Sequence, residues 1–266
     1  MTEMIVLLAA KKKEQAMRFL KWVCLVLMVL SVDPAIAKEK LTPKQILDYV
    51  DDLYRGESSY AKMSMKVVTE HWTREMKMEG WSQGKEKSMF RILAPKKEKG
   101  MATLKSGDNI WNYLPKVKRV IKLPSSMMGG SWMGSHLTND DLVKESRMAE
   151  DFDFENTFRG EKDGQEIIEI TCVPKPKAAV VWGKVVPAVR EGDYMPLKML
   201  YYDEDLELAR TMTFEDIKKL GGRTLPAVMK IVPADKPEEF TKFRYEKVEF
   251  NIKLKKGLFS LRNLQR

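Results

Sequence analysis

The chain has 266 residues, of which 44% are hydrophobic and 32% are charged, and it carries a net charge of +9 at pH 7. This length and a mean hydropathy of −0.38 fit one soluble domain, or two at most. The basic balance is typical of a protein with anionic partners, either lipid headgroups or nucleic acid, and equally of a soluble basic surface without such a partner.

Residues 1–37 predict a cleaved secretory signal peptide, which leaves residues 38–266 as the mature domain. Residues 22–32 are an apolar run of 11 residues, shorter than the roughly 20 residues that cross a bilayer. Arg18 and Lys21 precede the run, and an A-x-A site that ends at Ala37 follows it. This is the order of elements in a signal peptide. Export argues against nucleic acid as a partner.

A start at Met17 gives a compact signal peptide, so residues 1–16 are interpreted as an upstream extension of the reading frame. The alternative is an amphipathic or membrane-anchoring N-terminal helix. Cys24 lies within the signal, and the residues before it are not the small ones that a lipoprotein cleavage site needs. The mature chain then keeps one cysteine, Cys172, which predicts a buried thiol and no intramolecular disulfide.

The mature chain opens with a predicted helix. Thr42 is its N-cap, Pro43 occupies the first helical position, and Gln45 completes a capping box. Apolar residues recur behind the cap at helical spacing and form one face, and Gly56 ends the helix. The apolar face consists of Ile46, Leu47, Val50, Leu53 and Tyr54.

From residue 60 onwards the hydrophobic pattern has a period of two, which predicts antiparallel strands with one buried face. About ten or eleven strands are expected, at the 8–12-residue spacing of a sandwich or barrel. No linker or repeat divides residues 38–266, so a single, mainly β (α+β) domain is predicted. The strand-like stretches are 60–67, 72–79, 88–93, two within 100–120, 152–158, 166–173, 180–189, 194–202, 206–214, 224–232 and 240–252.

Residues 100–120 contain two of these predicted strands. Residues 106–109 form the turn between them, because Gly and Asx residues tolerate turn geometry, and Pro115 ends the second strand. Trp111 and Tyr113 share one face of that second strand. We expect this hairpin to form the central wall of the sheet.

Residues 123–136 depart from the alternating pattern, with three Gly, three Met and one Trp. Met adapts to irregular surfaces and Gly permits hinges. The segment is therefore interpreted as a mobile flap over an apolar surface, and a loop packed against the core is the alternative. A short helix is expected from Thr138 onwards. The candidate flap residues are Met127, Met128, Trp132 and Met133.

Apolar strand residues are the candidate lining of a ligand cavity. The mature chain has 14 Met, and these adaptable side chains suit a cavity for flexible ligands. The alternative is that they fill the core between helix and sheet. The candidate cavity residues are Met63, Met65, Met76, Met78, Phe90, Ile92, Trp111 and Tyr113.

Patterns for catalysis and metal binding are missing from the sequence. The two histidines, His71 and His136, lack the spacing of a zinc site, which needs three or four ligands. Ser135, His136, Asp140 and Asp141 occur without the G-x-S-x-G context of a hydrolase. We therefore predict no enzyme activity, no metal and no other cofactor.

Several segments resemble the outer-membrane lipoprotein-sorting proteins, the LolA/LolB-like group, and most closely its branch of larger LolA-like periplasmic proteins. The resemblance covers most of residues 41–266. The segments are F-R-I-L-A-P at 90–95, S-G-D-N-I-W-N-Y-L-P at 106–115, S-W-M-G-S-H-L-T-N-D-D-L at 131–142, Y-M-P-L-K at 194–198 and G-L-F-S-L-R-N-L at 257–264.

The resemblance implies a strongly curved, incompletely closed antiparallel β-barrel whose concave face is covered by helices. It also implies a monomeric periplasmic carrier that shelters acyl chains of lipids or lipidated proteins. Such carriers work between an inner-membrane transporter and an outer-membrane acceptor. The alternatives are a non-enzymatic accessory module of a membrane transporter or envelope complex and, less favoured, an envelope hydrolase.

The sequence departs from that family at one position. In the best-known carriers an Arg directly before the Pro of F-R-I-L-A-P helps to latch the lid. Here this position is Ala94, and Arg91 lies three residues earlier. We do not expect Arg91 to take over the latch, so the cargo stays open between lipoproteins and other lipids.

Overall fold

The computed structural model describes residues 40–144, 148–176, 178 and 180–266. Residues Leu41–Arg266 form one compact unit. The predicted signal peptide of residues 1–37, with Met17, Cys24 and the cleavage site, lies outside the described residues.

The described part of the chain is mainly β, as predicted, and its strands form one antiparallel sheet of thirteen strands. The order across the sheet is β6-β5-β4-β3-β2-β1-β13-β12-β11-β10-β9-β8-β7. The strands are β1 (Ser58–Val68), β2 (Thr73–Gln83), β3 (Lys87–Ala94), β4 (Ala102–Ser106), β5 (Asn109–Leu114), β6 (Arg119–Lys122), β7 (Phe152–Lys162), β8 (Gln165–Pro174), β9 (Lys184–Arg190), β10 (Pro196–Tyr202), β11 (Leu208–Leu220), β12 (Arg223–Pro233) and β13 (Phe240–Phe250).

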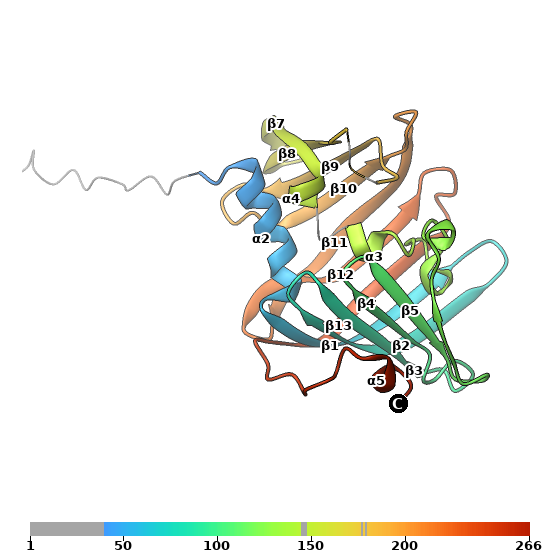
Figure 1. Cartoon of the computed structure of the whole chain (residues 1–266). Coiled ribbons are helices and arrows are strands. Elements are labelled where there is room, and N and C mark those ends of the chain that lie inside the picture. The colour runs from blue at the N-terminus through green and yellow to red at the C-terminus, as the bar shows by residue number, and fades with distance from the viewer. Residues whose placement is uncertain (1–39, 145–147, 177, 179) are drawn as a thin grey trace, which may run out of the picture. The chain divides into compact units, whose positions relative to one another are not determined.

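The first strand pairs with the last. The register of β1 and β13 runs from Ser59 opposite Phe250 to Val68 opposite Phe240. Two meanders, β1–β6 and β7–β13, therefore join along this seam, and β6 and β7 are left as the two edges of a curved, open sheet (Figure 1). The open, curved architecture that the sequence resemblance implied is confirmed.

The position of the 100–120 hairpin was predicted wrongly. It supplies β4 and β5, which lie beside the edge strand β6 rather than at the centre of the sheet. Residues Arg119–Lys122 form β6 itself, which the hydrophobic pattern did not assign to a strand, and Lys116 and Lys118 lie in the turn before it. An edge position suits them, because charged side chains on an edge discourage pairing with other chains.

The helix α2 (Pro43–Arg55) has the predicted capping box. The backbone N–H of Gln45 donates to the Thr42 hydroxyl at 3.3 Å, and the Gln45 side chain accepts from the backbone N–H of Thr42 at 2.8 Å. Ile46, Leu47 and Leu53 are buried, and α2 lies on the concave side of the sheet (Figure 1). The other described helices are η1 (Ser125–Met127), η2 (Trp132–Gly134), α3 (Asp141–Lys144), α4 (Met148–Asp151) and α5 (Leu261–Leu264).

Two hydrophobic clusters cover the two faces of the sheet. The main cluster contains α2 residues and the apolar face of β1 and β2. The second cluster joins Met89, Ala102 and Leu104 to Leu264 of α5, which lies outside the curve of the sheet (Figure 1). Cys172 is fully buried in the main cluster, as predicted, and burial raises the pKa of its thiol to about 12.

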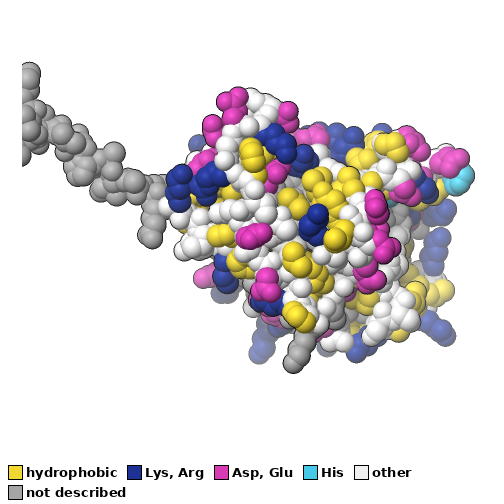
Figure 2. All heavy atoms as spheres, turned by 90° about the horizontal axis from the view of Figure 1, so that it is seen from above, with side chains coloured by type: hydrophobic (Ala, Val, Ile, Leu, Met, Phe, Trp, Pro, Cys, Tyr) yellow, Lys and Arg dark blue, Asp and Glu magenta, His cyan; other side chains and the backbone are white. Residues whose placement is uncertain are grey.

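The described helices are short, and charges of both signs share the face drawn in Figure 2. Among the described residues, no helix has the length and apolar character that a transmembrane span requires. Figure 2 shows basic and acidic side chains mixed over one face of the molecule, with hydrophobic side chains gathered between them.

The seam between the two meanders makes a testable contribution to stability. Met65 of β1 is fully buried and lies opposite Phe243 of β13 and Met76 of β2. We expect Met65→Ala to lower the free energy of unfolding by about 2–5 kcal/mol, because it leaves a cavity. Chemical denaturation measures this. Val117→Ala, at an exposed site, is the control, and equal losses in both variants would contradict the assignment.

Candidate functional site

A cavity lies between α2 and the concave face of the sheet, with a volume of about 210 Å³. At roughly 10–15 Å³ of such volume per water molecule, it has room for on the order of 15–20 water-sized groups. Its lining combines α2, eight of the described strands, the turn between β2 and β3, and described residues between β6 and β7. The lining residues are Leu47, Asp48, Val50, Asp51, Tyr54, Arg55, Ser59, Ala61, Met63, Gly80, Trp81, Ser82, Lys85, Ser88, Phe90, Trp132, Leu137, Leu142, Met148, Pro187, Met199, Phe214, Met229, Phe243 and Tyr245.

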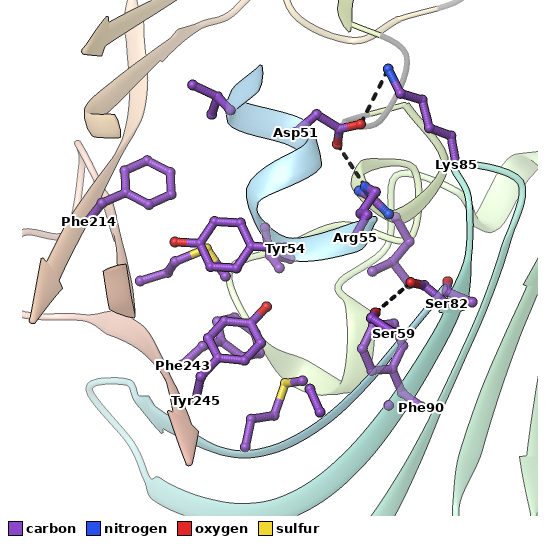
Figure 3. A pocket seen from close by; sticks show the side chains of 18 of the residues that line it. Asp51, Tyr54, Arg55, Ser59, Ser82, Lys85, Phe90, Phe214, Phe243 and Tyr245 are labelled. Carbon is purple, nitrogen blue, oxygen red and sulfur yellow. Dashed lines mark hydrogen bonds and ion pairs between the residues drawn. The ribbon is translucent and has the colours of Figure 1, made fainter. Parts of the chain in front are cut away.

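One side of the cavity is aromatic and apolar. In Figure 3, Phe214, Phe243 and Tyr245 approach from β11 and β13 and face Tyr54 of α2. The rings of Tyr54 and Tyr245 stack with their centroids 5.3 Å apart. The Tyr54 hydroxyl donates to the carbonyl oxygen of Pro226 at 2.9 Å, so this buried polar tip is satisfied.

The opposite side of the cavity is polar. Arg55 Nε lies 2.7 Å from Asp51 Oδ1, while Lys85 Nζ lies 3.4 Å from Asp51 Oδ2 and 3.1 Å from Asp48 Oδ1. Partial burial acts to raise the pKa of Asp48, but hydrogen bonds from Lys44 and Lys85 bring it below the usual value. Burial acts to lower the pKa of Lys85, yet its bond to Asp48 and the charge of Asp51 raise it. These pairs tie α2 to the turn between β2 and β3.

Lys105 of β4 supports that turn from behind. Its ammonium group donates to the backbone carbonyl oxygen of Lys85, and the residue is 3% exposed. Burial, and then the positive charge of Arg55, lower the pKa of Lys105 to about 8. A buried lysine therefore carries its charge at a cost near neutral pH.

The described residues between β6 and β7, 123–144 and 148–151, lie over the concave face, and we call them the crossing segment. Trp132 makes the first of its attachments to the sheet. This side chain is 2% exposed. Its ring packs against Phe90, with the centroids 5.3 Å apart, and against Phe243 at 6.2 Å. Its Nε1–H donates to the hydroxyl of Thr103 at 3.2 Å. The predicted flap is thus held in the core at its single tryptophan.

His136 provides a second attachment, to β13. Its backbone N–H donates to the Thr241 hydroxyl at 2.9 Å, and its Nδ1 lies 2.8 Å from the same oxygen. Its Nε2 lies 3.1 Å from Glu239 Oε2. The backbone N–H of Glu70 and the His136 ring together hold the pKa of Glu239 below its usual value.

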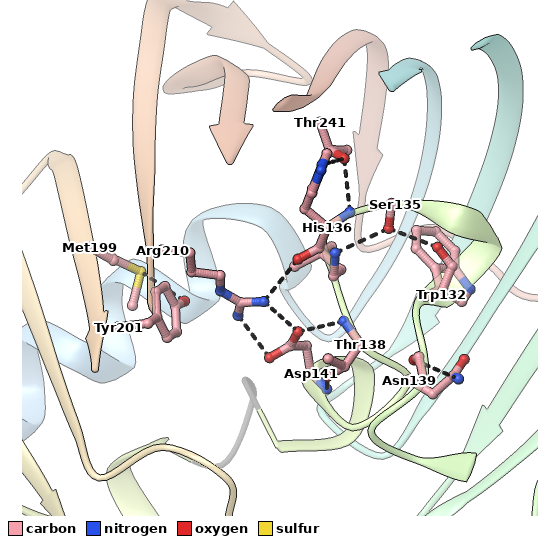
Figure 4. Close-up of polar contacts among 12 residues, drawn as sticks. Trp132, Ser135, His136, Thr138, Asn139, Asp141, Met199, Tyr201, Arg210 and Thr241 are labelled. Carbon is pink, nitrogen blue, oxygen red and sulfur yellow. Dashed lines mark hydrogen bonds and ion pairs between the residues drawn. The ribbon is translucent and has the colours of Figure 1, made fainter. Parts of the chain in front are cut away.

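A buried ion pair provides the third attachment. Arg210 of β11 binds Asp141 of α3 with both nitrogens, Nη1 to Oδ2 at 2.7 Å and Nη2 to Oδ1 at 2.8 Å, and both residues are 5% exposed. Nη1 also donates to the carbonyl oxygen of His136 at 3.1 Å. The guanidinium lies over the rings of Tyr201 and Trp182 (4.2 and 4.4 Å from their centroids). Figure 4 shows how this pair joins the crossing segment to the sheet.

The crossing segment is therefore held without an Arg before Pro95. Arg91 lies elsewhere: its Nη2 donates to the carbonyl oxygen of Asn263 beside α5, at 2.9 Å. The expectation that Arg91 does not bind the lid agrees with this contact. Arg210, from the other meander, makes the contact instead.

Three of the predicted site residues line the cavity, namely Met63, Phe90 and Trp132. Four more belong to the same core cluster without lining the cavity: Met65, Met76, Met78 and Ile92. For these four, the fully buried positions agree with the alternative that methionines fill the core. Ligand contact by any of the predicted residues stays a prediction.

The remaining predicted site residues lie away from the cavity. Trp111 and Tyr113 pack in the second cluster, with α5. Met133 packs against the main cluster, Met128 is half-buried and Met127 is 56% exposed. The crossing segment thus combines buried and exposed methionines.

Sequence reasoning missed the polar side of the cavity and the buried ion pair. On three strands, a serine continues the series of alternating apolar residues on the same face, at the strand end nearest the turn between β2 and β3. These serines are Ser59, Ser82 and Ser88. A polar residue in an otherwise apolar alternation is the sequence signal for this side of the cavity. Arg210 stands in the series Leu208, Arg210, Met212 and Phe214. A charged side chain on the buried face of a strand predicts a buried partner of opposite charge, because an unpaired buried charge is strongly destabilising.

The residues that a hydrolase would need do not come together. Ser135 Oγ donates to the Trp132 carbonyl oxygen at 2.7 Å, His136 bonds Thr241 and Glu239, and Asp141 bonds Arg210. Each serves to hold the crossing segment. Among the described residues, no cluster of three His, Cys, Asp or Glu side chains has the arrangement of a metal site.

A family model described as that of an uncharacterized protein matches residues 84–266. No curated protein sequence matches the chain. Three solved structures are similar over most of its length. A domain described as an outer membrane lipoprotein-sorting protein, from Vibrio parahaemolyticus, is 24% identical with a TM-score of 0.73, covering 84% of this chain and 98% of that one.

The second is a DUF1329 family protein from Desulfovibrio piger, 19% identical with a TM-score of 0.75, covering 83% of this chain and 97% of that one. The third is a LolA superfamily protein from Nitrosomonas europaea, 19% identical with a TM-score of 0.71, covering 84% and 100%. The resemblance that the sequence segments indicated is confirmed at the level of the fold.

The buried ion pair predicts a large effect of Arg210→Met. Without Arg210, the Asp141 carboxylate is left buried without its cation, which costs about 3–5 kcal/mol. We expect this loss in the free energy of unfolding, and faster amide hydrogen exchange of residues 137–143. Arg190→Met is the control, because Arg190 binds Asp193 at 2.6 Å at an exposed site, where such pairs contribute about 0–1 kcal/mol. Similar losses in the two variants would refute the anchoring role.

Lys105 predicts a pH dependence of stability. The pKa of Lys105 is about 8 in the folded chain, whereas that of an unperturbed lysine is 10.5. Between these two pH values the unfolded chain binds the proton and the folded chain does not. The free energy of unfolding therefore rises with pH in this window, by up to about 3 kcal/mol. Chemical denaturation at several pH values measures this. The free energy of unfolding of the native protein should rise between pH 8 and 10.5 relative to that of Lys105→Met. Lys77→Met, at an exposed site, should track the native protein. Parallel curves for the native protein and Lys105→Met would contradict the assignment.

Proposed function

This chain belongs to the family whose model matches residues 84–266 and has the LolA-like fold, and on this premise we propose that it is a non-enzymatic periplasmic carrier of acyl chains. The cavity between α2 and the concave sheet is the observation that carries the proposal. It is lined by apolar and aromatic side chains on one side and by polar side chains on the other.

The size of the cavity supports a ligand with one long acyl chain. Room for on the order of 15–20 water-sized groups matches such a chain. Ten buried methylenes contribute on the order of 8 kcal/mol, enough to offset part of the cost of association and leave useful affinity. Met63, Met199 and Met229 in the wall can adapt to the shape of a chain.

The crossing segment supplies a cover that has discrete attachments. Trp132, His136 and Asp141 fasten it to β3, β4, β11 and β13, and Arg74 of β2 donates to the carbonyl oxygen of Met133. Releasing these contacts would open the cavity without breaking the sheet. Delivery of the chain to an outer-membrane acceptor, from an inner-membrane transporter, is the transport role that we propose with this cover.

The proposal predicts saturable binding of a neutral apolar probe in the cavity. We expect N-phenylnaphthylamine to bind with one site and to be displaced by acyl ligands. Ala61 lines the cavity, and Ala61→Leu should weaken the binding of acyl ligands about 15- to 60-fold, because the added side chain displaces two or three methylenes at ~0.8 kcal/mol each. Fluorescence titration measures this.

The matched control is Ala234→Leu, which adds the same side chain at an exposed site. It should bind the probe as the native protein does. The carrier proposal fails if the native protein shows no saturable binding, or if the two leucine variants bind alike.

A further inference from the structure

Four buried polar residues form one row across four neighbouring strands at the polar side of the cavity. In register, Ser59 of β1 faces Ser82 of β2, Ser82 faces Ser88 of β3, and Ser88 faces Lys105 of β4. Cross-strand partners project from the same face of a sheet, and the three serines line the cavity. We call Ser59, Ser82, Ser88 and Lys105 the polar row.

The polar row is buried, yet its hydroxyls are not all used. The exposed fractions of Ser59, Ser82 and Ser88 are 6, 8 and 8%. The hydroxyl oxygens of Ser59 and Ser82 are 2.6 Å apart and share one hydrogen bond. The hydroxyl that accepts this bond keeps its own hydrogen free to donate to another group. The Ser88 hydroxyl has no hydrogen-bond partner among the described residues. Two O–H donors are thus available beside the cavity.

The charges around the row are set by α2 and the β2–β3 turn. Figure 3 shows Arg55, Lys85 and Asp51 on the same side of the cavity as Ser59 and Ser82. Asp51 bonds both cations. On this side, then, hydroxyl donors and cationic donors meet at one place.

The carboxylates here do not outnumber the cations. Asp48 and Asp51 line the cavity with Arg55 and Lys85, and the Lys105 ammonium lies behind the turn. Two further acids act on Lys105, Glu86 and Asp108, and both are exposed outside the cavity lining. The lining thus carries as many cations as carboxylates, and the serine hydroxyls and the Lys105 ammonium behind the turn add donors to them.

We propose that the polar row, with Arg55 and Lys85, holds the anionic headgroup of the ligand, a carboxylate or a phosphate at the end of its acyl chain. This inference rests on the proposed function, since it assigns the two ends of one ligand to the two sides of the cavity. Anionic oxygens accept from Ser88 and from the shared Ser59–Ser82 pair, and charge-assisted bonds to Lys85 and Arg55 add selectivity.

The test is a competition titration against bound N-phenylnaphthylamine with three ligands that share one palmitoyl chain. They are palmitate, palmitoyl lysophosphatidic acid and the neutral monopalmitoylglycerol. We expect the better of the two anionic ligands to displace the probe at a concentration about tenfold or more below that of the neutral one. If palmitate displaces the probe at the lower concentration, the headgroup is that of a fatty acid. If palmitoyl lysophosphatidic acid does, the headgroup is that of a phospholipid.

Two variants test the residues. Ser88→Ala and Lys85→Gln should each reduce, several-fold, the ratio between the displacing concentrations of the neutral ligand and the better anionic ligand; we call this ratio the gap. The concentration of monopalmitoylglycerol that displaces the probe should stay as in the native protein. The controls are Ser64→Ala, on the opposite face of β1, and the exposed Lys62→Gln. Both should keep the gap.

The outcomes separate the two proposals. Equal displacement by charged and neutral ligands overturns the headgroup site and leaves the acyl cavity standing. A loss of affinity for all three ligands alike in both variants also overturns it, because the row would then only support the cavity. If none of the ligands displaces the probe from the native protein, the carrier proposal fails and the headgroup site with it.

Discussion

The structure depends on one constraint: a thirteen-stranded sheet curves strongly but does not close. Pairing of β1 with β13 joins two meanders along a seam and leaves β6 and β7 as separate edges. The concave face carries the apolar side chains of many strands and needs a cover. The chain supplies it twice, by α2 and by the segment that leads from one edge strand to the other.

How that cover is attached decides what the concave face can do. A cover packed by apolar contacts alone would fill the space below it. Here Trp132 enters the core at one point, while His136 and Asp141 bond polar groups of β13 and β11. A cavity of about 210 Å³ lies between these anchors and α2. Its aromatic side and its polar side lie on different meanders, which suits an amphiphilic ligand.

Much of the fold could be predicted from the sequence, because it follows from local patterns. Period two predicted the strands and the capping box predicted α2, but the edge position of β4 and β5 depends on pairing between distant strands. In the site, periodicity placed Met63 and Phe90 on the concave face. It could not separate cavity from filled core, since Met65 and Met78 share the same pattern. Arg210 and Asp141 are 69 residues apart, and only the folded sheet brings them together.

The central claim is that the cavity holds one acyl chain. Native mass spectrometry of the mature protein, purified from an envelope extract without detergent, tests it most directly. The account predicts one bound lipid per chain, which is lost from Ala61→Leu at unchanged folded content. A native protein that carries no lipid, and takes up none when incubated with palmitoyl ligands, would contradict it.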